Sequence, residues 1–324
     1  MAKLKCSSFF AGIGGIDIAF EENGFDVVYA NEIDSNAAIT LEKNNTKIKV
    51  DCRDINEVHA DEIPDFDVML AGFPCQAFSL AGYRQGFDDE KGRGTLFFEL
   101  ERIFRTKAPG IVFLENVKNL VGHDNGETFR TILEKLENEG YYVKYQILNA
   151  MLYGNIPQNR ERIYILAFKN KHLYERFEFP KPIPLTTSIS ELIDFETKIE
   201  KKYYYTKENC SFYDVLNKDV TRTDTVYQWR RVYVRENKSN VCPTLTANMG
   251  TGGHNVPLIF TKHGIRKLTP YECFRLQGFP STFIIPENLA NSHAYKQAGN
   301  SVVVPVISRI AKELQKVLKE INTF

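Results

Sequence analysis

Short apolar segments alternate with helical stretches over roughly the first 170 residues, and this alternation constrains the fold more than any other feature. The segments with the length and character of buried strands are Leu4–Phe9, Val27–Asn31, Val68–Ala71, Ile111–Glu115, Tyr142–Leu148 and Ile163–Phe168. Strands separated by helices predict an α/β fold with a doubly wound, mostly parallel sheet, similar to the Rossmann fold. A closing helix is expected over Val302–Lys319, where apolar and charged residues alternate at helical spacing.

The alternation fails between about residues 170 and 265. Prolines cluster there at Pro180, Pro182 and Pro184, and a glycine-rich segment follows at 250–253. We therefore expect a large domain over residues 1–175 that is completed by 288–324. A smaller, irregular, β-containing domain with a hinge is expected over 176–287.

Composition excludes several classes of protein. No run approaches the roughly 18 apolar residues of a membrane span, so no membrane association is expected. Six cysteines without a C-x-x-C pair argue against a zinc site and against a secreted disulfide framework, and they favour a reducing cytoplasm. The 41 basic residues balance the 41 acidic ones, so any contact with nucleic acid must come from local patches.

A glycine-rich turn follows the first predicted strand. Phe10, Gly12 and Gly14 lie where the backbone of such folds approaches a ligand closely. Glu32 ends the second predicted strand about twenty residues later, where a carboxylate can hold ribose hydroxyls. Asp54 and Ile55 could bind an adenine amino group. The carboxylates of Glu32 and Asp54 could equally belong to ordinary surface residues.

A second motif places Pro74 and Cys75 directly after the apolar strand Val68–Ala71, at the edge where parallel sheets bind ligands. Most lone cysteines are buried small hydrophobes, but here a turn and the polar, glycine-rich segment Gln76–Gly94 indicate a loop over a cleft. A nucleophilic thiol with a usual pKa of about 8.5 would need electropositive neighbours. The third motif, Glu115–Val117, follows the strand Ile111–Leu114 at the same edge, and the carboxylate of Glu115 can share that cleft.

Three further blocks complete the pattern. Arg160 and Arg162 are two residues apart, which in an extended segment points both to one face and suits an anionic substrate. Surface salt bridges are the alternative for each arginine. The other two blocks cover residues 266–280 and 297–302.

These six blocks, in this order and at this spacing, resemble the bacterial cytosine-carbon-5 DNA methyltransferases of restriction-modification systems. The resemblance implies a large sheet domain that holds cofactor and catalytic residues, and a small target-recognition domain. It implies double-stranded DNA as substrate and S-adenosylmethionine as cofactor, with S-adenosylhomocysteine as product. It also implies pairing with a restriction endonuclease, and we expect a monomer acting on the nucleoid in the bacterial cytoplasm.

Site residues follow by the same resemblance. The cofactor-binding residues would be Phe10, Gly12, Gly14, Glu32, Ile33, Asp54, Ile55, Pro74 and Asn300. Cys75 would add to carbon 6 of cytosine, and Glu115 would contact ring nitrogen 3 and the exocyclic amine. Arg162 would hold the carbonyl oxygen, while Arg160 would orient the site.

The DNA contacts are expected from two segments. The loop after Cys75 would act as a lid over the extruded base through Gln76, Ser79 and Arg93. This loop is longer than the commonest family form, and Arg93 is the residue in it that we expect to contact phosphate. In the small domain, Arg230, Arg231, Arg235 and Thr246 would grip phosphate or read base edges. These segments favour a short G/C-rich palindrome with a degenerate centre.

Two other functions stay open at this point. A tRNA cytosine methyltransferase could use the same scaffold, although the long insert over about 170–265 favours DNA. An inactive DNA-binding homologue would normally lack Cys75, Glu115 or the cofactor turn, and this chain has all three.

Overall fold

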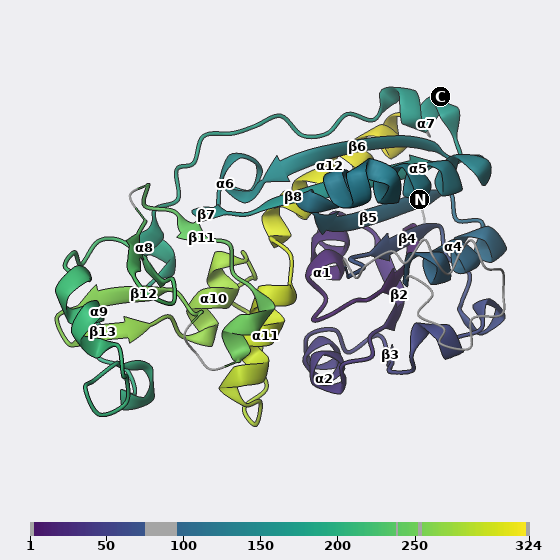
Figure 1. Ribbon diagram of the computed structural model, residues 1–324. Helices are drawn as coiled ribbons and strands as arrows, with labels where there is room; N and C mark the ends of the chain where they lie inside the picture. Colours follow the sequence, from purple (N-terminus) through teal and green to yellow (C-terminus); the bar gives the residue numbers. More distant parts are fainter. Residues whose placement is uncertain (1–2, 75–95, 238, 252–254, 322–324) are drawn as a thin grey trace. The chain divides into compact units, whose positions relative to one another are not determined.

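The computed structural model describes residues 3–74, 96–237, 239–251 and 255–321 (Figure 1). The chain divides into two compact units. Unit 1 comprises Met1–Leu148, Glu161–Pro180 and Ile307–Phe324, and unit 2 comprises Asn149–Arg160 and Lys181–Val306. Each unit is described by itself.

Unit 1 is built on a sheet in which the described residues form seven strands in the order β3-β2-β1-β4-β5-β8-β6. Their bounds are β1 Lys5–Phe9, β2 Asp26–Asn31, β3 Val50–Asp51, β4 Val68–Ala71, β5 Ile111–Val117, β6 Tyr142–Asn149 and β8 Glu161–Phe168. All six predicted strands are confirmed. Strand β3 was not predicted, because two residues carry no detectable pattern.

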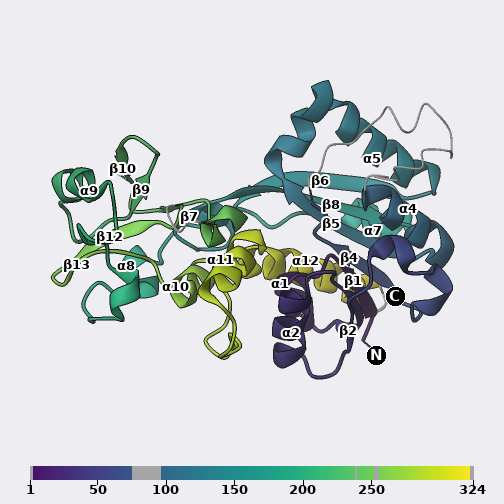
Figure 2. The same cartoon turned by 60° about the horizontal axis from the view of Figure 1, so that its bottom comes forward.

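Helices cover both faces of this sheet (Figure 2). They are α1 Gly15–Glu21, α2 Ser35–Asn44, α4 Leu96–Lys107, α5 Glu127–Asn138, α7 Lys171–Arg176 and α12 Val304–Ile321, with 3₁₀ turns η1 Ile55–Glu57, η2 Ala60–Glu62 and η3 Lys118–Gly126. Helix α12 is the predicted closing helix. The doubly wound, mostly parallel fold is confirmed.

Alternation along β5 explains why both faces are covered. Val112 and Leu114 pack with the buried side chains of α4 and α5 in one core cluster. Phe113 points to the other face, where its ring lies 5.2 Å from that of Phe20 on α1. Because both faces of the strand are apolar, it can exist only between two layers of helices.

The carboxyl ends of four parallel strands meet at one edge. Strand β1 pairs in parallel with β2 and β4, and β4 pairs in parallel with β5, with Phe9 opposite Asn31 and Ala71 opposite Leu114. Glu32, Phe10, Gly72 and Glu115 therefore lie in this order along the edge. Strand β8 runs antiparallel to β5 and brings Arg162 opposite Val117, at the same edge.

Unit 2 contains a four-stranded antiparallel sheet in the order β10-β9-β12-β13, and β11 pairs with β7 in the described residues. Its strands are β7 Gln158–Asn159, β9 Tyr227–Trp229, β10 Val234–Glu236, β11 Cys242–Pro243, β12 Leu258–Thr261 and β13 Gly264–Lys267. Its helices are α6 Ala150–Tyr153, α8 Ile189–Leu192, α9 Tyr213–Asp219, α10 Pro270–Leu276 and α11 Asn291–Asn300, with 3₁₀ turns η4 Lys201–Tyr203 and η5 Ala247–Gly250. Among the described residues, no helix is long and apolar enough to cross a membrane.

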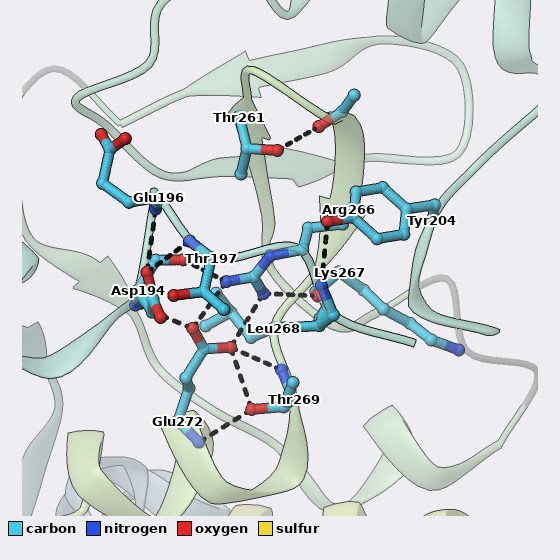
Figure 3. Close-up of polar contacts among 12 residues, drawn as sticks. Asp194, Glu196, Thr197, Tyr204, Thr261, Arg266, Lys267, Leu268, Thr269 and Glu272 are labelled. Carbon is cyan, nitrogen blue, oxygen red and sulfur yellow. Dashed lines mark hydrogen bonds and ion pairs between the residues drawn. The ribbon is translucent and has the colours of Figure 1, made fainter. Parts of the chain in front are cut away.

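A buried ion pair holds the sheet of unit 2 to α10 (Figure 3). The fully buried guanidinium group of Arg266 on β13 donates from Nη1 and Nη2 to the two carboxylate oxygens of Glu272, at 2.9 and 2.7 Å. The same carboxylate accepts from the backbone N–H of Thr269 at 2.7 Å and so begins the helix with a capping box. The sequence block at 266–280 therefore has a structural task within this unit.

Candidate active site and cofactor pocket

The turn after β1 leaves its backbone open to a ligand. Phe10, Gly12 and Gly14 have φ angles of 53°, 59° and 81°, in the left-handed region. A Cβ atom at Gly12 would meet nothing within 4 Å, whereas one at Gly14 would lie 2.5 Å from Cδ1 of Leu41. The missing side chain of Gly12 thus lets a ligand approach the backbone closely, whereas that of Gly14 permits tight packing against α2.

Glu32 stands beside this turn at the end of β2. Its Oε2 accepts a hydrogen bond from the backbone N–H of Gly12 at 2.8 Å, and its Oε1 accepts from that of Asp34 at 2.8 Å. A carboxylate has about four acceptor sites, so further hydroxyl groups can bind to it. The next side chain, Ile33, is 61% exposed and offers an apolar surface at the same edge. An open turn, a fixed carboxylate and an exposed apolar side chain fit the ribose and base of S-adenosylmethionine.

Asp54 follows β3 and is fixed in a local turn. Its Oδ1 accepts from the backbone N–H of Asn56 at 3.0 Å. The side chain of Ile55 is buried in the core, so only its backbone can reach a ligand. Asn31 holds this loop by donating to the carbonyl groups of Asp51 and Arg53, at 3.0 and 2.9 Å. Asn31 was not predicted from the sequence, although an amide side chain at a strand end next to Glu32 is a usable signal.

A second carboxylate is buried beneath the glycine turn. Asp17 in the first turn of α1 is 1% exposed, and its Oδ1 accepts a hydrogen bond from the Ser8 hydroxyl at 2.6 Å. Burial in this apolar surrounding raises the pKa of Asp17 to about 7, and nearby Glu21 adds to the increase. The hydrogen bond from Ser8 acts in the opposite direction and limits it. The carboxyl group of Asp17 therefore changes its protonation state near neutral pH.

The catalytic candidates gather at the ends of β5 and β8. Glu115 is 8% exposed, and its Oε1 lies 3.1 Å from Nε of Arg162. Arg162 also donates from Nη1 to the carbonyl oxygen of Glu161 at 2.9 Å. A Cβ atom on Gly72, the residue that follows β4, would lie 3.6 Å from Oε2 of Glu115. The carboxylate therefore stands next to the chain that leads to Pro74.

Asn116 fixes the start of that chain. Its Nδ2 donates to the carbonyl oxygen of Phe73 at 2.9 Å, and the Asn116 side chain is buried. Pro74, which follows Phe73, is exposed at this edge. The predicted residues Cys75, Gln76, Ser79 and Arg93 lie outside the described residues. Asn116 directly follows Glu115 in the chain, but the sequence alone assigned it no role.

The two predicted arginines have different partners. Arg162 belongs to unit 1 and pairs with Glu115. Arg160 belongs to unit 2, is 3% exposed, and donates to the carbonyl oxygens of Leu245, Gly299 and Ser301. The extended segment breaks at Arg160, between β7 and β8, so the expected pair on one strand face is not formed.

Unit 2 also carries the remaining predicted contacts, all of them exposed. Asn300 ends α11, and Thr246 precedes η5. Arg230 and Arg231 lie in the loop that joins β9 to β10, and Arg235 lies on β10. Arg231 has a φ of 69°, and the loop is closed by a hydrogen bond from the backbone N–H of Arg230 to the carbonyl oxygen of Tyr233 at 2.9 Å.

The doubly wound sheet, the open glycine turn and the carboxylate–guanidinium pair at the same edge define an α/β enzyme that binds a nucleoside cofactor. A family model described as C-5 cytosine-specific DNA methylase matches residues 4–316, and the chain belongs to this family. The protein catalyses methyl transfer from S-adenosylmethionine to carbon 5 of cytosine in DNA.

Relatives cover almost the whole chain. It is 61% identical to the Type II methyltransferase M.Bsp6I of Bacillus sp. (strain RFL6), over 97% of this chain and 99% of the relative. It is 38% identical to M.HhaI of Haemophilus parahaemolyticus, over 95% of this chain and 93% of the relative. The crystal structure of S. pombe Dnmt2 methyltransferase agrees in fold, with a TM-score of 0.73 at 20% identity over 99% of this chain and 100% of that one.

Proposed function

We propose that Cys75 is the nucleophile of this methyl transfer and that Glu115 and Arg162 hold the reacting cytosine. The observation that carries the proposal is the 3.1 Å pair between Glu115 and Arg162 at the ends of β5 and β8. Strand β4, next to β5, ends at the same edge and is followed by Gly72, Phe73 and Pro74, and Cys75 is the next residue in the sequence. A nucleophile, a carboxyl group and a fixed cation would then face one ligand.

The chemistry needs each of these groups. Carbon 5 of cytosine is a poor nucleophile until the Cys75 thiolate adds to carbon 6. Glu115 would contact ring nitrogen 3 and the exocyclic amine and share a proton with the ring, a step worth about 10²–10⁴-fold in rate. Arg162 would hold the carbonyl oxygen as negative charge develops on it.

S-adenosylmethionine supplies the methyl group that replaces the hydrogen on carbon 5. That hydrogen leaves as a proton to a base, the bond between Cys75 and carbon 6 breaks, and the thiolate is restored. We assign the cofactor to Phe10, Gly12, Gly14, Glu32, Ile33, Asp54, Ile55, Pro74 and Asn300. The open turn at Gly12 and the fixed carboxylate of Glu32 support this assignment.

The target base has to leave the duplex, which costs a few kcal/mol of stacking and pairing. We assign the residues after Cys75 to this step, through Gln76, Ser79 and Arg93. In the small domain, proposed over residues 176–287, the exposed side chains of Arg230, Arg231, Arg235 and Thr246 would contact DNA. Residues 1–175 with 288–324 would form the catalytic domain.

The cellular task would be protection of DNA against a cognate restriction endonuclease. The relatives' printed description as Type II methyltransferases supports this context. We propose that the protein acts as a monomer on the nucleoid in the bacterial cytoplasm. The target would be a short G/C-rich palindrome with a degenerate centre.

Bisulfite sequencing of DNA from cells that express the protein tests the function directly. One short sequence should carry 5-methylcytosine at nearly every copy, and cells with Cys75→Ser should show none, because an alcohol is a far weaker nucleophile at neutral pH. The purified variant should still bind DNA and S-adenosylhomocysteine. Methylation that persists with Cys75→Ser would contradict the assignment of the nucleophile.

A further inference from the structure

The segment Leu245–Gly250 and helix α11 touch through their backbones, within unit 2. A Cβ atom at Gly299 would overlap the carbonyl group of Thr246, and one at Gly250 would overlap that of Ser292. No other residue type permits this approach at either position without moving the partner backbone. Thr246 and the end of α11 are therefore held in one register.

Arg160 ties the same two segments together from the interior. Its Nη1 donates to the carbonyl oxygen of Leu245 at 2.7 Å, and its Nη2 donates to those of Gly299, at 3.2 Å, and Ser301. A guanidinium group presents its donors in a rigid fork, so it fixes the acceptors relative to one another. With Arg160 buried, water cannot easily replace these bonds.

Two buried glutamines extend the connection. Gln158 accepts from the backbone N–H of Leu245 at 3.2 Å and donates to the carbonyl oxygen of Leu276 at 2.7 Å. Gln277 donates to the carbonyl oxygen of Ala298 at 2.6 Å. Both side chains are fully buried. A satisfied polar network of this kind rigidifies the backbone segments that it joins.

We propose that Arg160 is a positioning residue that couples DNA binding at Thr246 to cofactor binding at Asn300. The inference rests on the proposed function, which assigns Thr246 to DNA and Asn300 to S-adenosylmethionine. Thr246 follows Leu245, whose carbonyl group Arg160 binds. Asn300 stands between Gly299 and Ser301, whose carbonyl groups Arg160 also binds.

The physical reason for the coupling is that both binding sites depend on the same ordered backbone, which Arg160 holds. A ligand that immobilises Asn300 also restrains the backbone held by Arg160, so that less freedom remains to be lost when DNA engages Thr246. Coupling between two binding sites is reciprocal: each ligand raises the affinity for the other by the same factor. The sequence placed Arg160 among the catalytic residues, whereas the hydrogen bonds that its side chain donates to Leu245, Gly299 and Ser301 go to the backbone of unit 2.

The test measures this coupling factor in the full-length protein. The probes are S-adenosylhomocysteine and a duplex that carries the mapped target site, and the dissociation constant of each is measured with and without saturating amounts of the other. We expect a factor of about 5–150 in the wild-type protein, equal in both directions. In Gly299→Ala, whose new methyl group overlaps Thr246, the factor should fall towards one.

Arg160→Lys supplies a second variant that keeps the charge but loses the fork, and it too should lower the factor. Gly122→Ala is the matched control, because a Cβ atom there would meet nothing within 4 Å, and it should keep the wild-type factor. Thermal unfolding of each variant shows which of them are folded.

Two results would overturn the inference and leave the proposed function standing. One is an uncoupled wild-type protein that binds both ligands and methylates cytosine. The other is an unchanged coupling factor in Arg160→Lys or folded Gly299→Ala, even with both affinities weakened, because Arg160 would then act only as a structural residue. Failure of the proposed function is different, since the Cys75→Ser variant would then still transfer methyl groups to cytosine.

Discussion

The strand edge of unit 1 and the hairpin β9–β10 of unit 2 hold their functional candidates in contrasting ways. At the strand edge, Glu32 and Glu115 are fixed by neighbouring donors and stand at the ends of buried strands. On the hairpin, Arg230, Arg231 and Arg235 are exposed. Bond-forming chemistry needs fixed geometry, whereas contact with DNA needs side chains that reach outward. Changes at the edge should therefore alter rate or cofactor affinity, and changes on the hairpin should alter the sequence methylated.

The buried ion pair between Arg266 and Glu272 lies in the same unit as the exposed hairpin. Breaking this pair should give the largest loss of stability. Glu272→Gln leaves the charge of Arg266 buried without its carboxylate, which typically costs about 3–5 kcal/mol. Chemical denaturation followed by circular dichroism measures the free energy of unfolding. The matched control is Asp224→Asn at the exposed pair with Arg222, which should lower the free energy of unfolding far less, because water and salt screen that pair. Equal losses in the two variants would contradict a structural role for the buried pair.

At the strand edge, Glu32→Ala should weaken binding of S-adenosylmethionine. Each hydrogen bond to a charged acceptor contributes about 1.5–3 kcal/mol, and the variant also frees the N–H groups of Gly12 and Asp34. Isothermal titration calorimetry measures the affinity, with the exposed Glu22→Ala as control. If Glu32→Ala binds the cofactor as the wild type does, Glu32 is not in the pocket.

On the hairpin, Arg231→Ala should relax the choice of target by ~1–3 kcal/mol at one base pair. Single-turnover methylation of matched duplexes, each with one changed base pair, measures this discrimination.

Exchange of residues 222–262 for the segment of a relative with another target should transfer the specificity and leave the chemical rate intact. A hybrid that still methylates the original site would show that recognition lies elsewhere.

The smallest expected effect concerns the buried carboxyl group beneath the cofactor turn. The pKa of Asp17 is raised to about 7, so the folded protein holds a proton that the unfolded chain releases near pH 4. The contribution of this group to the free energy of unfolding is therefore fully present at low pH, and it is lost as the pH rises through 7. Compared with Asp17→Asn, the wild-type protein should lose about 1–2 kcal/mol of unfolding free energy between pH 5 and pH 7. Parallel pH profiles of the two proteins would contradict this.

The same contrast explains what could be predicted from the sequence. Strands such as Val68–Ala71 are continuous apolar runs, and Gly12, Glu32 and Glu115 lie at or shortly after the ends of such runs. Both the fold and the strand edge could therefore be predicted from the sequence. The antiparallel direction of β8 was not, since an apolar run carries no direction. The carbonyl partners of Arg160 were also hidden, because Leu245 and Ser301 are 85 and 141 residues away and backbone acceptors have no sequence signature.

The covalent step at Cys75 is tested most directly with a duplex in which 5-fluorocytosine replaces the target cytosine. Fluorine on carbon 5 cannot be removed as hydrogen is, so the protein should stay attached to the DNA once the methyl group has been transferred. With S-adenosylmethionine present, a protein–DNA adduct that survives denaturation should accumulate with the wild-type protein and not with Cys75→Ser. Absence of the adduct in the wild-type protein, under conditions where the unmodified duplex is methylated, would contradict a cysteine-linked mechanism.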